Sequence, residues 1–310
     1  MGDFQIRKEL QAADPSSGVD VNSSGSVPNF AQIARHAQRK RFLGAGAVVG
    51  VLAIPVAIAA FAFGGGSPST VELADLKGAK SKPAPTAVAA PVIQNVEFSG
   101  APSLELGATA SELVGADQNF RSGRDGFSFP NYGGEPTSDV IDATTMAALF
   151  GKESVCADAK AATCVILPGA QAVADQLNAA MAAGRCEGFS VLSQRFFDNL
   201  DTRPDGLGAT NQVAHSSVAK QLGYWWATQV APSVAASSKS FRSMTPSAIA
   251  LELAKGLKSK AGYTMGLYSP AGGHSVTPIA VTKNGATQYI YVYDNNYPNE
   301  IRKIAIDTAT

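Results

Sequence analysis

The longest uncharged, apolar stretch of the chain is residues 42–63. A helix needs about 20 apolar residues to cross the hydrocarbon core of a bilayer, and a proline such as Pro55 is tolerated in membrane helices. The basic residues of segment 35–41 predict a cytoplasmic N-terminus and an exported C-terminal part. We therefore expect a single-pass transmembrane helix in the cell membrane, in contact with the lipid bilayer. A cleaved signal peptide is the alternative, because Ala60-Phe61-Ala62 has the pattern of a cleavage site, and it too would export the C-terminal part.

The stretches on either side of this segment differ in composition from a folded domain. Residues 1–41 are polar and rich in Ser, Gly, Asp and Gln, which predicts a disordered cytoplasmic tail. Residues 64–110 are rich in Pro, Ala and Gly, which is typical of a linker, although Val92–Phe98 has the composition of an edge strand. The folded extracytoplasmic domain is expected to span residues 111–310.

Within residues 111–310 the period of the apolar positions changes along the chain. The earlier part carries apolar residues every three to four positions, which predicts helices. The last part carries short β-branched and aromatic runs, which predict strands, with one turn at Asn284-Gly285. Helices followed by antiparallel strands indicate an α+β domain. The expected helices are 137–150, Ala170–Met181, Cys186–Leu200, Ser216–Val234 and Thr245–Leu257, and the expected strands are Tyr263–Tyr268, His274–Val281, Gln288–Tyr293 and Ile301–Ile306.

Composition and charge exclude two classes of function. The chain has 25 Lys and Arg residues against 25 Asp and Glu residues, so it has no excess positive charge for binding nucleic acid, and we expect no such partner. Its three His and three Cys residues are not grouped at the spacing of metal ligands. We therefore expect no metal site and no cofactor.

The three cysteines leave one thiol unpaired in a monomer. Cys156 and Cys164 are close in sequence and are the expected disulfide of an exported domain. Cys186 would then be free, at the start of a predicted helix, where the helix dipole favours negative charge. Two alternatives stay open: an inert buried cysteine, and a Cys164–Cys186 disulfide, which would remove any catalytic role.

A cysteine nucleophile needs a base, and that base needs a group that orients it. His274 follows two glycines and begins a predicted strand, and a hairpin turning at Asn284-Gly285 brings Asp294 back roughly opposite His274. An acid there can bind one imidazole nitrogen and leave the other for the thiol. The alternative is that His274 and Asp294 form only a structural pair across the sheet.

The order of these elements resembles the papain-like cysteine peptidases. The resemblance rests on Cys186-Glu187-Gly188-Phe189 opening a helix, Gly273-His274-Ser275-Val276 opening a strand, and the strand Tyr289–Asp294 ending where that family places an Asn. It implies a papain-like fold, with the helix of the nucleophile packed on an antiparallel sheet. It also implies that Cys186 is the nucleophile, His274 the general base and acid, and Asp294 the orienting group.

The sequence departs from that family on the oxyanion side of the site. The family places a Gln six residues before the nucleophile, but this position is Ala180, and the Gly-Ser-Cys-Trp run around the nucleophile is also absent. Asn178 and Gln176 are the nearest side-chain amides and are candidate oxyanion donors beside the backbone N–H of Cys186. The chain is thus expected to be a distant branch.

Three functions agree with this pattern. The first is a membrane-anchored, extracytoplasmic thiol peptidase or amide hydrolase that acts on a peptide or protein substrate. The second is an inactive papain-like domain that binds an envelope protein partner. The third is an acyl transferase of the transglutaminase type, which shares the triad, and nothing in the sequence separates transfer from hydrolysis.

Overall fold

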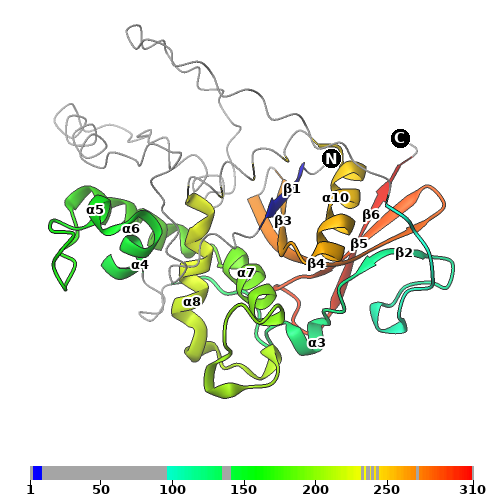
Figure 1. Cartoon of the computed structure of the whole chain (residues 1–310), viewed down its shortest axis with the longest axis horizontal. Helices are drawn as coiled ribbons and strands as arrows, with labels where there is room; N and C mark the ends of the chain where they lie inside the picture. Colours follow the sequence, from blue (N-terminus) through cyan, green and yellow to red (C-terminus); the bar gives the residue numbers. More distant parts are fainter. Residues whose placement is uncertain are drawn as a thin grey trace, which may run out of the picture.

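The computed structural model describes residues 96–134, 141–231, 244–269 and 272–308, the single residues 234, 238 and 241, and the backbone of residues 3–8. It has the predicted α+β class, with an antiparallel sheet and several helices. The helices are α3 (Ser122–Asp125), α4 (Ala143–Phe150), α5 (Lys152–Val155), α6 (Pro168–Met181), α7 (Cys186–Phe197), α8 (His215–Ala227) and α10 (Pro246–Ser259). The strands are β1 (Asp3–Lys8), β2 (Leu113–Asp117), β3 (Tyr263–Ser269), β4 (Gly272–Asn284), β5 (Thr287–Tyr293) and β6 (Ile301–Asp307). Figure 1 shows α10 against the sheet and α4 to α8 gathered beside it.

Strand β4 is the centre of the sheet. The strand order is β1-β3-β4-β5-β6, and β2 also pairs with β4. The first residues of β4 pair with β3, and its later residues pair with β5 and β2, always antiparallel. The register between β4 and β5 shifts between Pro278 and Ala280, which marks a β-bulge.

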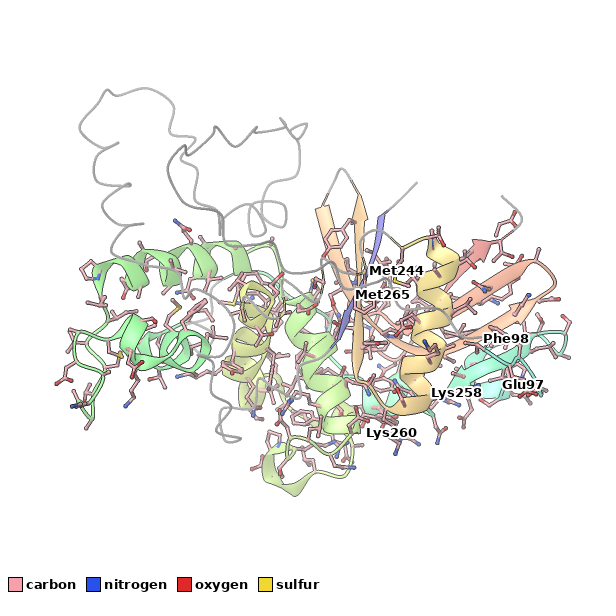
Figure 2. The ribbon with its side chains drawn as sticks, turned by 45° about the horizontal axis from the view of Figure 1, so that its top comes forward. Glu97, Phe98, Met244, Lys258, Lys260 and Met265 are labelled. Atoms are coloured by element: carbon pink, nitrogen blue, oxygen red, sulfur yellow. A yellow bond between two sulfur atoms is a disulfide. The ribbon has the colours of Figure 1, made fainter. Side chains whose placement is uncertain are left out.

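Helices α7 and α10 contact β4 from different sides. Val276 of β4 packs in an apolar core with Leu253 of α10 and Met265 of β3, and Figure 2 shows Met244 and Met265 beside this helix. The next residue, Thr277, donates a hydrogen bond of 3.2 Å to the carbonyl oxygen of Ser190 in α7. Because neighbouring strand residues point to opposite faces, the sheet lies between the two helices at this point.

The helices beside the sheet largely agree with the predictions. Helices α6, α7 and α10 begin within two residues of the expected positions, and Thr245 caps α10 by accepting from the N–H of Ala248 at 3.2 Å. Helix α8 is shorter than expected, ending at Ala227, and a 3-10 helix follows. Helix α4 begins after Asp142, whose carboxylate accepts from the N–H of Thr145 at 2.8 Å.

The unit formed by α4, α5 and α6 is closed by a disulfide. Cys156 and Cys164 form the predicted bond, with their Cα atoms 5.1 Å apart. Helices α4 and α6 share an apolar core with Trp226 at the end of α8. This core attaches the unit to the rest of the domain, and it leaves Cys186 as the free thiol.

The folded domain starts earlier than residue 111, so the predicted end of the linker is wrong. Val96 and Phe98 pack against the core under α10, and the N–H of Ser99 donates to the carbonyl of Val114 at 3.0 Å. Leu106 is buried at 3 % exposure. Val96 and Phe98 belong to the candidate edge strand Val92–Phe98, whose described residues pack against the core without forming a strand. Leu106 was concealed by the Pro- and Ala-rich composition of segment 64–110.

One described element lies within the predicted tail. Strand β1 pairs antiparallel with β3, and Phe4 is opposite Leu267, which departs from the expected disorder. Phe4 and Ile6 alternate with polar residues, which is the period of a strand. The rest of the tail and the apolar segment 42–63 lie outside the described residues, and none of the helices within those residues is long and apolar enough to cross a membrane.

Candidate active site

Cys186 is the first residue of α7, and the loop before it is held from several sides. Gly184 has a φ of 125°, a conformation that favours glycine. The guanidinium group of Arg185 is buried and donates to the carbonyl oxygens of Tyr132 at 3.1 Å and Gly134 at 2.9 Å. These contacts fix the point at which α7 begins, and thus the position of the thiol, whose residue is 7 % exposed.

An aromatic cluster supports the same loop from the other side. Phe189, in the first turn of α7, makes edge contacts with the rings of Phe127, Phe129 and Tyr132. The guanidinium of Arg185 lies 4.5 Å from the centre of the Tyr132 ring, a favourable cation–π distance. The start of α7 is therefore anchored on its apolar side by rings of the segment 127–132.

His274 and Asp294 are in direct contact, as the hairpin count predicts. The Nε2 atom of His274 lies 2.7 Å from Oδ1 of Asp294, and their side chains are 22 % and 15 % exposed. Thr277 pairs with Tyr293, so by extension of this register Asp294 lies beside Val276 rather than directly opposite His274. Without the shift at the β-bulge the register would place Asp294 opposite Thr277, so the bulge brings it one residue closer to His274. The Asp294 side chain spans the remaining offset by reaching diagonally along the sheet to the imidazole.

The contacts of His274 determine its charge. Burial by itself would lower the pKa of His274. The interactions with Asp294 and Cys186 outweigh burial and raise the pKa from 6.5 to about 9. Burial raises the pKa of Asp294, but the bond to His274 and the charge of the ring outweigh this and hold it below its usual value. At neutral pH the pair is thus an imidazolium beside a carboxylate. Because Nε2 faces Asp294, Nδ1 is the ring nitrogen left for the Cys186 thiol.

The two amides expected to complete an oxyanion site have other surroundings. Asn178 accepts from the N–H of Ile141 at 2.6 Å and donates to the carbonyl of the same residue at 3.1 Å, so its amide holds the chain before α4. Gln176 is half-buried on α6 and makes no hydrogen bond to Cys186 among the residues that the structure describes. Neither side chain is hydrogen-bonded to Cys186 in the described part of the chain.

Two other asparagines lie beside the start of α7, and the sequence analysis missed both. Asn131 accepts from the N–H of Arg185 at 2.7 Å and donates to Asn296 at 3.1 Å. Asn295 is fully buried and donates to the carbonyl oxygen of Cys186 at 3.1 Å. Both stand in segments rich in turn-forming residues, so the sequence signals a loop there and not a buried contact.

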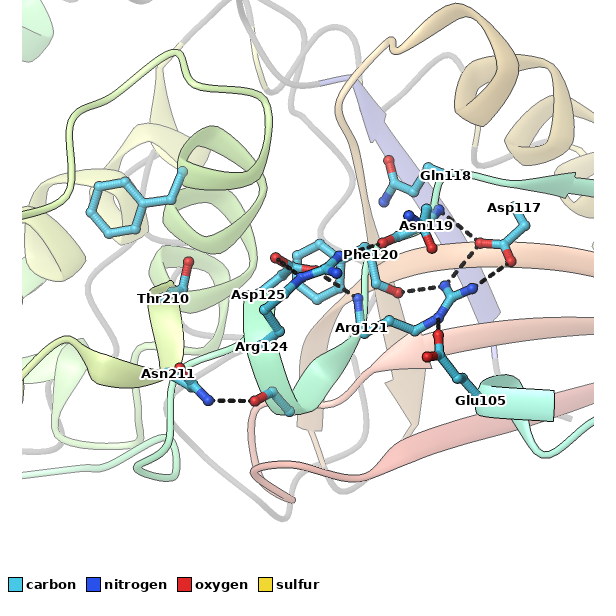
Figure 3. Close-up of polar contacts among 12 residues, drawn as sticks. Glu105, Asp117, Gln118, Asn119, Phe120, Arg121, Arg124, Asp125, Thr210 and Asn211 are labelled. Atoms are coloured by element: carbon cyan, nitrogen blue, oxygen red, sulfur yellow. Dashed lines mark hydrogen bonds and ion pairs between the residues drawn. The ribbon is translucent and has the colours of Figure 1, made fainter. Parts of the chain in front are cut away.

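A second polar cluster, which includes none of the candidate site residues, surrounds Arg121 (Figure 3). Arg121 donates to Asp117 and Glu105, and Arg124 donates to Asp125. The cluster borders an open pocket of about 600 Å³. Its arginines are already paired with carboxylates. Arg121 joins the 3-10 helix Leu104–Leu106 to the end of β2, and Arg124 pairs with its neighbour in α3.

The candidate site therefore consists of Cys186, His274 and Asp294, from three different elements. No group of His, Cys, Asp and Glu that would suit a metal ion occurs in the described part of the chain. Comparison with the models of known families, with curated proteins and with solved structures finds no match to this chain. The site is therefore interpreted from its own geometry.

Proposed function

We propose that this protein is a thiol-dependent peptidase or amide hydrolase, with Cys186 as nucleophile, His274 as general base and acid, and Asp294 as the orienting group. The observation that carries the proposal is the position of His274, whose Nε2 atom lies 2.7 Å from Asp294 and whose pKa is raised by both Asp294 and Cys186. A nucleophile, a base and an orienting acid in this order are the arrangement that activates a thiol.

In the proposed reaction the thiolate of Cys186 attacks the carbonyl carbon of a peptide or related amide. The tetrahedral intermediate collapses to a thioester while the imidazolium of His274 gives its proton to the leaving amine. His274, now neutral, takes a proton from water, which attacks the thioester and releases the acid. The thiolate and the imidazolium are then restored. The backbone N–H of Cys186, at the start of α7, is a donor for the oxyanion.

One observation favours a second candidate, an inactive domain that binds a protein partner. Cys186 is 7 % exposed, which is little for a nucleophile that must meet a macromolecule. In such a domain the three residues would only stabilise the junction of α7 with the sheet. The two candidates differ in whether the thiol reacts and whether that reaction depends on His274.

Alkylation with iodoacetamide tests the proposal, because Cys186 is the free cysteine and mass spectrometry identifies the labelled peptide. We expect His274→Ala to slow alkylation at neutral pH by about 100-fold, the scale of a positioned acid or base. Lys255→Ala is the matched control, since Lys255 is also a half-buried basic residue paired with an acid, Glu252, and lies in α10. Equal rates in the unmodified chain and in His274→Ala would overturn the proposal.

We also propose that segment 42–63 anchors the chain and that the domain is extracytoplasmic. The disulfide between Cys156 and Cys164 supports an oxidising compartment. The pairing of β1 with β3 counts against it, because residues on opposite sides of a membrane cannot pair within one chain. Protease added to intact cells should remove a tag at the C-terminus, and a tag that stays protected would refute the location.

A further inference from the structure

Asn295 touches the elements that carry all three residues of the candidate site. Its Nδ2 atom lies 3.1 Å from the carbonyl oxygen of Cys186 and 2.8 Å from the carbonyl oxygen of Ser275. Ser275 directly follows His274, and Asn295 itself directly follows Asp294. Asn295 is thus hydrogen-bonded to Cys186 itself and to the residue after His274, and it is the residue after Asp294.

The orientation of this amide is determined by its partners. Backbone carbonyl oxygens only accept hydrogen bonds, so the group that faces Cys186 and Ser275 must be the NH₂ and not the oxygen. The same nitrogen lies 3.2 Å from Oγ of Ser190, one turn further along α7. The amide therefore binds α7 and β4 at once, and its two hydrogens are shared among three acceptors.

The backbone of Asn295 extends the same connection to the loop before the thiol. Its carbonyl oxygen accepts from the N–H of Asn131 at 2.7 Å. The side chain of Asn131 accepts in turn from the N–H of Arg185, the residue before Cys186. The start of α7 is thus connected to Asn295 in two ways, directly through the Asn295 side chain and indirectly, by way of Asn131, through the Asn295 backbone carbonyl.

Stability alone does not explain an asparagine at this position. Asn295 is fully buried, and its Oδ1 atom has no hydrogen-bond partner among the residues that the structure describes. The Oγ atom of Ser275 is also buried without a hydrogen-bond partner among the described residues. Unpaired buried oxygens reduce stability, so they call for another explanation.

We propose that Asn295 is a positioning residue, which fixes the start of α7, with Cys186, relative to the start of β4, with His274. The role rests on the proposed function, because it matters only if the pair reacts. Asn295 does not touch the reacting atoms. It acts through the carbonyl of Cys186 and the carbonyl of Ser275, so its loss lets α7 and β4 shift relative to each other.

A double-mutant cycle on alkylation of Cys186 in the full chain, with iodoacetamide as the probe, tests this role. Asn295→Ala should slow alkylation by about 10- to 100-fold, because a displacement of about 1 Å has this effect on reacting groups. In the Asn295→Ala background, His274→Ala should slow alkylation further by less than about threefold, since the contact is already lost. Asn295→Ser, which is too short to reach both carbonyls, should behave in the same way and serves if Asn295→Ala does not fold.

The control is Ile249→Ala, which opens a cavity in the apolar core between α10 and the sheet, on the side of β4 away from α7. It lowers stability without touching the site, so His274→Ala should keep its full effect in that background. If His274→Ala also keeps its full effect with Asn295→Ala and Asn295→Ser, the positioning role is wrong and the proposed function stands. If His274→Ala has no effect in the unmodified chain, both the proposed function and the positioning role are wrong.

Discussion

Replacing Asp294 by Asn tests the electrostatics of the candidate site. The Asn side chain can still accept a hydrogen bond from Nε2 of His274, so the change removes the negative charge while it keeps the acceptor. Burial lowers the pKa of His274, and the interactions with Asp294 and Cys186 together raise it above its usual value. Asp294→Asn should therefore lower the pKa of His274 without abolishing the contact.

The size of the effect follows from the shift itself. The pKa of His274 rises from 6.5 to about 9, and this difference corresponds to about 3 kcal/mol of preference for the imidazolium at about 1.4 kcal/mol per pH unit. An opposite charge in contact accounts for roughly 1 to 3 pH units. In Asp294→Asn we expect the pKa to fall by roughly 1 to 2 pH units. With Cys186→Ser added, burial remains as the main influence, and His274 should titrate below 6.5.

The assay is a pH titration of the imidazole C–H signals by NMR. The chain has three histidines, so the His274→Ala spectrum identifies the signal of His274. Asp201→Asn is the matched control, because Asp201 is also ion-paired, with Arg195, in another part of the domain. Titration of His274 near 6.5 in the unmodified chain, or no change in Asp294→Asn, would refute the electrostatic argument.

Three further predictions concern the framework of the site. Glu112 is buried, which raises its pKa, but its hydrogen bonds outweigh burial and lower the pKa from 4.5 to about 2. The carboxylate therefore contributes about 3 kcal/mol to the unfolding free energy above pH 4.5, and this contribution is lost as the pH falls through 2. Denaturant unfolding should show this loss in the unmodified chain and not in Glu112→Gln. Gly188→Ala would place a Cβ 2.0 Å from the carbonyl oxygen of Leu222 in α8, so it should lower the unfolding free energy by about 1–3 kcal/mol, whereas Gly123→Ala, with open space, should not. Replacing Cys156 and Cys164 by Ala should lower the melting temperature, because the disulfide contributes roughly 2 to 3 kcal/mol for so short a loop.

Local patterns were sufficient to predict much of the fold and part of the site. The period of apolar residues predicted α7 and the β4–β5 hairpin, and counting from the turn predicted the contact between His274 and Asp294. Both depend on neighbours along one helix or one hairpin. Because the register within a hairpin is set by its turn, such a pair is predictable without knowledge of the rest of the chain.

The parts that could not be predicted depend on contacts between distant segments. Asn178 was expected near the thiol because it is close in sequence, but its amide is bound by Ile141. Asn131 is far from Cys186 in sequence and lies beside it because the aromatic loop packs on Phe189. No local period marks an asparagine that is buried by another segment, and Asn295 was missed for the same reason.

The start of α7 is held in two physically different ways, and this difference bears on the proposed chemistry. On one side Phe189 and Leu192 pack into an apolar core, which stabilises the helix but is non-directional. On the side of β4, hydrogen bonds from Asn295 and Thr277 fix distances within a few tenths of an ångström. A nucleophile and a base on separate elements react only if their separation is fixed, so directional bonds at this junction are what the proposed reaction requires.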